Sequence, residues 1–170
     1  MSHHHRIPLL VAVRPHLRQL VLDLLPDTFL PTICHSFHEA IHALARERFG
    51  MVLCSVQFDE NKLYDLLRHI RETVDTYRLP FVAAMMDRYA GDARTRDAAV
   101  KSLALLGVDN FVNCSEFLQQ GDISGARGRL RDALLRFAPP SGQEDHENTY
   151  SGPLGLQQTG LPDSSMAREN

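Results

Sequence analysis

Short apolar segments alternate with amphipathic segments along most of this 170-residue chain, and this alternation restricts the possible folds more than any other feature. The longest apolar segment, residues 7–13 (IPLLVAV), has no polar position, which is typical of a strand covered on both faces of a parallel sheet. Four shorter apolar segments are also interpreted as strands of this sheet. The predicted strands are residues 7–13, 32–36, 51–56, 81–85 and 110–113.

Between these strands, apolar residues recur at the three- and four-residue spacing of a helix face. The first stripe is Leu17, Leu20, Val21, Leu24 and Leu25, ended by Pro26, and the second is Ile41, Leu44, Ala45 and Phe49, with Gly50 as C-cap. The third stripe is Leu63, Leu66, Leu67, Ile70, Val74 and Tyr77. The fourth helix is residues 94–106, capped by Gly107, and the last stripe is Leu130, Ala133, Leu134 and Phe137. Alternating strands and helices predict right-handed crossovers and a parallel sheet. We therefore predict a doubly wound α/β fold, (βα)5, with ligand chemistry at the carboxyl ends of the strands.

Composition divides the chain into a domain and two terminal segments. Residues 6–137 form the predicted domain, and residues 1–5, with three adjacent histidines, are expected to be disordered or a purification-tag remnant. Residues 138–170 have no apolar period and are rich in Pro, Gly and Ser, so we expect a disordered tail. The tail carries a net charge of −4, whereas the whole chain carries −3, so the domain itself is nearly neutral.

Several classes of protein are disfavoured by the same composition. No apolar run approaches the roughly 20 residues that cross a bilayer, so we expect a cytoplasmic protein without a membrane partner. Three cysteines without paired spacing do not indicate a disulfide framework. A net charge of −3 and the lack of aromatics interleaved with basic residues argue against nucleic acid as a partner.

Four phrases of the sequence are similar to those of the receiver domain of bacterial two-component response regulators. They are HLRQLVLDLL (16–25), HEAIHALARERFGMVLCSV (38–56), PFVAAMM (80–86) and LLGVDNFV (105–112). The resemblance covers residues 6–137. It implies a flavodoxin-like three-layer sandwich whose five-stranded parallel sheet has the strand order 2-1-3-4-5.

The resemblance also implies where the family's chemistry would lie. Receivers hold Mg²⁺ with two acids after the first strand and an aspartate ending the third, which accepts the phosphoryl group. A hydroxyl residue and a lysine follow strands four and five and contact the phosphate. The matching positions here are Ala12 and Val13 for the acids, Ser55 for the acceptor, Met85 for the hydroxyl and Cys114 for the lysine. We therefore expect no Mg²⁺ site, no cofactor and no phosphotransfer.

A retained fold pattern with a stripped site predicts a non-enzymatic signalling role through protein–protein contacts that do not depend on phosphorylation. In the family, the fourth helix, fifth strand and last helix form the partner surface, and the matching residues are Lys101, Phe111, Arg127 and Arg131. The partner would be another signalling protein or a second copy. Phe111 stands where receivers carry a switch aromatic, although it could simply fill a strand position.

The arginines of the last helix leave another alternative open. Arg127, Arg129, Arg131 and Arg136 could bind an acidic partner, nucleic acid or the chain's own acidic tail. A solvated helix face is the simpler interpretation.

The sequence His38-Glu39-Ala40-Ile41-His42 is a literal H-E-x-x-H, the zinc motif of metal-dependent hydrolases. Its third ligand would come from Asp59, Glu60 or Glu72. Ser36 and Glu39 also have capping-box spacing, which gives Glu39 an ordinary role at a helix start. A looser cluster, Cys34, His35, His38 and His42, is a further possible transition-metal site.

A redox or ligand sensor is the remaining alternative. Cys54 and Cys114 are expected near the carboxyl ends of neighbouring strands, around the pocket that lost its acids. A thiol sensor there would need a low thiol pKa, whereas buried free cysteines are usually inert.

Overall fold

The computed structural model describes residues 6–87 and 93–138. The predicted N-terminal segment, residues 1–5, and nearly all of the predicted tail lie outside this range. The helices and strands are β1 (Ile7–Ala12), α1 (Arg18–Leu24), β2 (Phe29–Cys34), α2 (Phe37–Arg46), β3 (Met51–Ser55), α3 (Leu63–Glu72), β4 (Phe81–Met85), α4 (Ala93–Leu105), β5 (Asn110–Asn113), α5 (Ser115–Gln119) and α6 (Ile123–Leu135). Short 3₁₀ turns cover Pro15–Leu17 and Phe58–Asn61.

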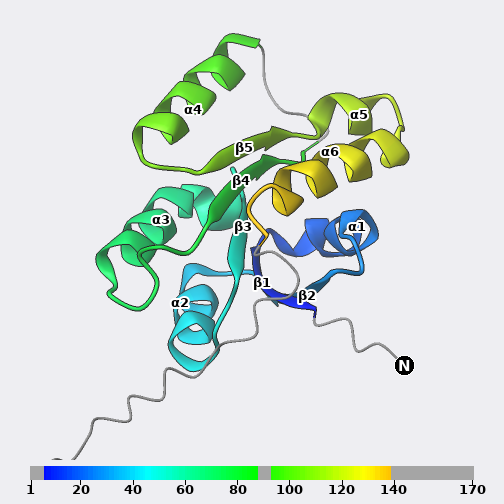
Figure 1. The fold of residues 1–170 in the computed structure, drawn as a ribbon. Helices are drawn as coiled ribbons and strands as arrows, with labels where there is room; N and C mark the ends of the chain where they lie inside the picture. Colours follow the sequence, from blue (N-terminus) through cyan, green and yellow to red (C-terminus); the bar gives the residue numbers. More distant parts are fainter. Residues whose placement is uncertain (1–5, 88–92, 139–170) are drawn as a thin grey trace, which may run out of the picture.

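The five strands form one parallel sheet in the order β2-β1-β3-β4-β5, as predicted. Helices α1, α5 and α6 cover one face, and α2, α3 and α4 cover the other (Figure 1). Side chains of β1 alternate between the two layers: Leu9 and Val11 pack towards α1 and α6, and Leu10 and Ala12 towards α2 and α3. Burial on both faces explains why this strand is apolar at every position.

Strand β2 begins earlier than the sequence indicated. It covers Phe29–Cys34, whereas we predicted residues 32–36. Pro31 cannot donate to a ladder, and β2 tolerates it because this strand lies at the edge of the sheet. The last two predicted positions, His35 and Ser36, instead form the turn that leads into α2.

Two predicted helix ends are also wrong. Helix α2 ends at Arg46, and Gly50 is not its C-cap: the Gly50 amide donates to the Pro8 carbonyl at 2.8 Å, where an added Cβ would lie 2.7 Å from Ile7. Helix α3 ends at Glu72 rather than continuing to Tyr77: the backbone of Thr73 is extended (φ −91°, ψ 125°), and its hydroxyl bonds back to the His69 carbonyl at 2.7 Å.

Val74 and Tyr77, which we had placed on the buried stripe of the third helix, are therefore exposed, with 83% and 46% of their surfaces accessible. The short helix α5 was not predicted. Its start is fixed by Asn113, whose side-chain oxygen accepts from the Ser115 amide at 3.0 Å. Helix α6 then begins separately at Asp122, which caps it through the Gly125 amide at 2.8 Å.

Arg71, near the end of α3, forms hydrogen bonds with the two loops that lead into β4 and β5. Its guanidinium donates to the carbonyls of Tyr77, Leu79 and Gly107 at 2.8–3.2 Å and pairs with the Asp109 carboxylate at 2.8 Å. The same Asp109 oxygen accepts from the Phe81 amide at 2.7 Å. One cation therefore positions the loops that enter β4 and β5.

Replacing Arg71 by alanine should lower the free energy of unfolding by about 2–3 kcal/mol, because several charge-assisted hydrogen bonds are lost at once. Urea denaturation measures the change. Arg68→Ala is the matched control on the same helix, since Arg68 makes only an exposed 3.9 Å contact with Asp65 and should matter by less than about 0.5 kcal/mol. Equal losses for the two variants would contradict this role of Arg71.

Candidate functional site

The five residues that match the receiver's chemical positions all lie at the carboxyl ends of strands, at one edge of the sheet. Ala12 pairs in register with Cys54, so β1 and β3 end at nearly the same level. Ser55 pairs with Ala84 at the next position. Cys114 follows β5, and its amide donates to the Met85 carbonyl at 2.9 Å. The structure thus brings the predicted positions together.

These side chains are packed rather than arranged around a pocket. Ala12, Val13 and Cys114 have no exposed surface, Ser55 has 1% and Met85 has 9%. Ala12 belongs to the apolar cluster beneath α2 and α3, whereas Val13 and Cys114 belong to the cluster beneath α1 and α6. Neither Ser55 nor any other of the five residues lines either of the two described grooves.

Magnesium requires several oxygen ligands in octahedral geometry. Apart from the Ser55 hydroxyl, the side chains at these five positions offer no oxygen atom at all. Within residues 6–87 and 93–138, no group of three or more His, Cys, Asp or Glu side chains could hold a metal ion. The residues present at the strand ends do not fit Mg²⁺.

A protein cation joins the loops after β1 and β3 instead. Arg14 directly follows Val13, and its Nε donates to the carbonyl of Gln57, two residues beyond Ser55, at 2.7 Å. Two further contacts bind the neighbouring loops: His35 Nδ1 lies 2.9 Å from the Val13 carbonyl, and His16 Nε2 lies 3.4 Å from an Asp87 oxygen. Hydrogen bonds from side chains therefore hold this edge together.

The loop after β3 contains a left-handed turn without glycine. Asp59, Glu60 and Asn61 have φ values of 40°, 53° and 75°. Such residues cost of order 1 kcal/mol each and persist only where their surroundings hold them. Here the Asp59 carboxylate accepts from the Phe37 amide at 2.8 Å, at the first turn of α2. Sequence reasoning missed this turn because it contains no glycine, although Asp59 and Asn61 are of the residue types that tolerate a left-handed conformation.

The H-E-x-x-H residues serve the start of α2 and lack a third metal ligand. The Ser36 hydroxyl accepts from the Glu39 amide at 3.2 Å, and Glu39 accepts from the His35 amide at 2.7 Å, so the predicted capping interaction is present in a shifted form. The candidate third ligands lie elsewhere: Asp59 and Glu60 are in the left-handed turn, and Glu72 lines a groove between α3 and α4. The zinc-hydrolase alternative is therefore not supported by the described residues, nor is the looser Cys34, His35, His38 and His42 cluster.

The three thiols are buried and separate. Burial raises the pKa of Cys114 to about 11 and that of Cys54 well above its usual value of 9.0. Burial, together with Glu39 and Glu47, raises the pKa of Cys34 to about 11. We expected Cys54 and Cys114 near neighbouring strands, and this prediction is wrong: β4 lies between β3 and β5. The two side chains also face opposite layers. A thiol sensor needs the opposite shift in pKa.

Of the predicted partner surface, Lys101 on α4 and Arg131 on α6 are exposed, and Phe111 on β5 is half-buried against the cluster beneath α4. Arg127 does not belong to this surface. Its guanidinium donates to the Asp23 carbonyl at the end of α1, with Nε at 3.0 Å, so it faces the other side of α6.

The fold is that of receiver domains. A response regulator from Hahella chejuensis superposes with a TM-score of 0.62 at 12% identity, covering 81% of this chain and 99% of that chain. The phosphorylated cyanobacterial phytochrome response regulator RcpA gives 0.60 at 14% identity, covering 80% and 99%. The receiver domain of a sensor histidine kinase from Pseudomonas aeruginosa, with a magnesium ion coordinated in its active site cleft, gives 0.51 at 17% identity, covering 72% and 98%.

No protein-family profile matches the sequence. No curated protein matches it either. Among the helices of the described residues, none is both long enough and apolar enough to cross a membrane.

Raising the pH from about 9 to about 11 should lower the free energy of unfolding, because unfolded thiols ionise in this window while the buried thiols stay neutral. The contribution is complete below pH 9 and is lost as the pH rises through the folded values. Each thiol that responds fully adds a slope of about 1.4 kcal/mol per pH unit. Urea denaturation across this range measures it.

Cys54→Ala is the matched variant, because it removes the most deeply buried thiol and leaves the tyrosines, which titrate in the same range, unchanged. Its slope should be shallower than that of the wild type. An identical slope would show that Cys54 ionises equally readily in both states.

Proposed function

We propose that this receiver-fold domain acts in signal transduction by binding another protein, and that it does so without phosphorylation. The observation that carries the proposal is the packing at the carboxyl edge of the sheet. Ala12, Val13 and Ser55 occupy the positions of the metal-binding acids and the acceptor, and all three are buried. A domain with this fold and without this chemistry can still present a surface to a partner.

The proposed loss of phosphotransfer rests on charge and access. Phosphoryl transfer depends on positioned cations that neutralise the phosphate oxygens and on an acceptor in line with the leaving group. Here the acceptor position is a serine with 1% of its surface exposed, and no acid occurs between Arg6 and Leu22 to bind a cation. Arg14 is committed to the Gln57 carbonyl. We accordingly propose that the domain needs no Mg²⁺ and catalyses no reaction.

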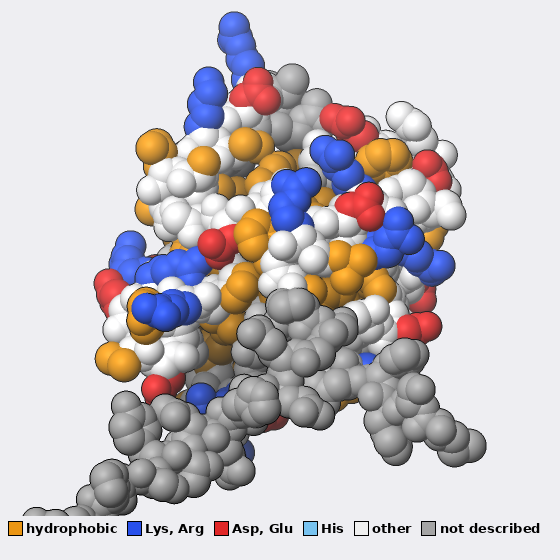
Figure 2. All heavy atoms as spheres, viewed as in Figure 1, with side chains coloured by type: hydrophobic (Ala, Val, Ile, Leu, Met, Phe, Trp, Pro, Cys, Tyr) orange, Lys and Arg blue, Asp and Glu red, His pale blue; other side chains and the backbone are white. Residues whose placement is uncertain are grey.

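The proposed partner surface comprises α4, β5 and the outer side of α6, with Lys101, Phe111 and Arg131. Leu105 and Leu106 lie at the end of α4, and Leu105 has 88% of its surface exposed. Hydrophobic side chains are visible over α4 beside basic side chains (Figure 2). Adjacent exposed leucines bordered by charges are typical of a contact surface for protein. The partner is another signalling protein or a second copy of this chain.

Adding Mg²⁺ with beryllofluoride, which mimics a phosphoryl group, should leave the amide chemical shifts around Ser55, Gln57 and Cys114 unchanged. No carboxylate is there to accept the adduct, and the acceptor position is closed. The magnesium-binding receiver domain from Pseudomonas aeruginosa serves as the positive control under identical conditions. Saturable shifts confined to the residues around Ser55 would overturn the proposal.

Amide chemical shifts measured over a wide range of protein concentration test whether the partner is a second copy of this chain. Concentration-dependent shifts at Lys101, Leu105 and Phe111 would identify self-association through this surface. Shifts confined to other elements would contradict the proposed surface.

A further inference from the structure

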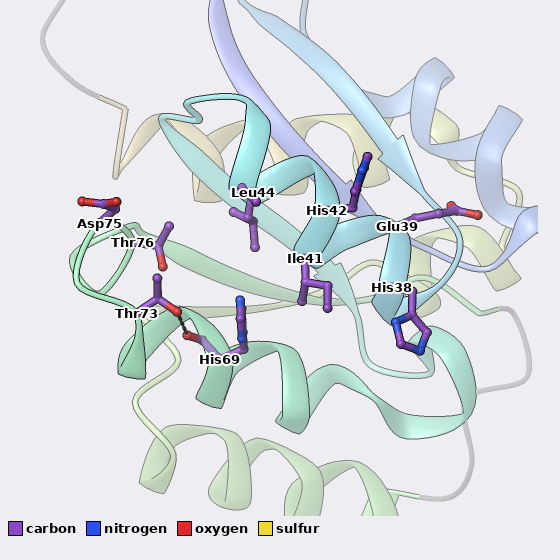
Figure 3. A pocket seen from close by; sticks show the side chains of 10 residues that line it. His38, Glu39, Ile41, His42, Leu44, His69, Thr73, Asp75 and Thr76 are labelled. Carbon is purple, nitrogen blue, oxygen red and sulfur yellow. Dashed lines mark hydrogen bonds between the residues drawn. The ribbon is translucent and has the colours of Figure 1, made fainter.

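A groove with a volume of about 930 Å³ lies between α2 and α3, away from the sheet edge described above. It is formed by α2, by the last part of α3 and by the loop that follows α3 (Figure 3). The residues that line it are His38, Glu39, Ile41, His42, Leu44, Ala45, His69, Thr73, Asp75 and Thr76.

The centre of the groove is apolar. Ile41 and Leu44 of α2 are half-buried and lie between the two helices (Figure 3). The hydroxyls of Thr73 and Thr76 are already used, because they donate to the carbonyls of His69 and Ile70 at 2.7 and 3.0 Å. These threonines therefore add methyl groups to the groove rather than free hydroxyls. An apolar groove between two helices fits an extended peptide with spaced apolar side chains.

Imidazoles supply the polar contacts that such a peptide needs. His38 and His69 flank the ring of Phe37 edge-on, with centroid distances of 6.1 and 6.3 Å, which fixes their positions. His42 lies one turn further along α2. Within the described part of the chain, the ring nitrogens of these three histidines have no hydrogen-bond partner. They can donate to or accept from the backbone of a bound extended segment.

The chain carries one segment with matching chemistry. Of the 32 residues after Ala138, residues 150–162 (YSGPLGLQQTGLP) contain the only tyrosine and the only leucines. Prolines at both ends of its leucine-containing part favour an extended backbone. The segment has no charged residue, whereas the acidic residues 144, 145 and 147 lie before it.

The segment can reach the groove. Helices α3 and α6 both run back from the carboxyl edge, so Ala138 and the Thr73–Thr76 end of the groove lie towards the amino edge of the sheet (Figure 1). Ala138 packs against the core cluster that includes Ile7, the first residue of β1. Tyr150 lies twelve positions after Ala138, and a chain of that length spans up to about 40 Å, which exceeds the diameter of a small domain, about 30 Å.

We propose that residues 150–162 bind in the α2–α3 groove of the same chain. Tyr150, Leu154, Leu156 and Leu161 then cover the apolar centre, and the histidines contact the peptide backbone. The segment is then an intramolecular ligand of this groove. This inference is independent of the function proposed above, which concerns the carboxyl edge of the sheet and the surface formed by α4, β5 and α6.

A nitroxide attached to full-length Ser151→Cys tests the proposal by paramagnetic relaxation. The native thiols are buried, so the label attaches at position 151. Amide signals of Ile41, Leu44, His69 and Thr73 should lose intensity several-fold, independently of protein concentration.

The same label in a chain that also carries Leu154→Ser, Leu156→Ser and Leu161→Ser is the matched control and should lose this broadening. Ala45→Arg, which places a long side chain in the groove at an exposed position, should abolish it without unfolding the domain.

Equal broadening with and without the leucines would overturn the proposal. So would broadening along Arg129 and Arg131 of α6, or in the second groove at Leu67, Ser102 and Leu106. Broadening that grows with protein concentration would place the segment in a second copy and would contradict binding within one chain.

Discussion

Burial of both faces of the parallel sheet is the constraint on which the rest of the structure depends. Each central strand sends alternate side chains into two apolar layers, and those layers extend to the carboxyl ends of the strands, where Ala12, Val13 and Cys114 are fully buried. A carboxylate placed there would be removed from water, at a cost of several kcal/mol unless a cation compensated for it. We propose that apolar residues at these positions make the fold independent of such a cation.

The loops at the carboxyl edge of the sheet are joined by side chains of the protein itself. Arg14 joins the loops after β1 and β3 through the Gln57 carbonyl, and Asp59 joins the latter loop to the first turn of α2. Hydrogen bonds that involve a charged group contribute about 1.5–3 kcal/mol. These contacts come from the chain itself and join loops that, in the proposed account, no metal or phosphate organises. We infer that the domain presents a constant surface rather than a switched one.

The fold could be predicted from the sequence because its strongest signals are local and repeated. The apolar run of β1 and the helical stripes of α1 and α3 report burial directly, and their alternation leaves few topologies. Exact element ends could not be predicted, because local backbone and packing details set them: Thr73 is extended after α3, and Gly50, expected as a C-cap, instead approaches Ile7 closely. The shift of β2 reflects its edge position, which no local pattern reports.

The sequence predicted where the residues of the candidate site lie in the sheet, but not the loop contacts around them. Matching strand ends to the receiver pattern placed Ala12, Ser55, Met85 and Cys114 at one edge, where the structure also has them. Neither the Arg14 contact nor the left-handed turn at Asp59 could be predicted, since both depend on loops meeting across the sheet. The groove between α2 and α3 was hidden for the same reason: its residues come from two helices separated in sequence.

The central claim is that the carboxyl edge of this sheet is complete without a metal. Its most direct test is the free energy of unfolding of the full chain with and without Mg²⁺, with ionic strength held constant by NaCl. A ligand that binds only the folded state stabilises it by RT ln(1 + [L]/Kd), about 2.7 kcal/mol at a hundredfold excess over Kd. The packed edge predicts no change. A saturable rise in stability with Mg²⁺, absent with NaCl, would contradict the claim.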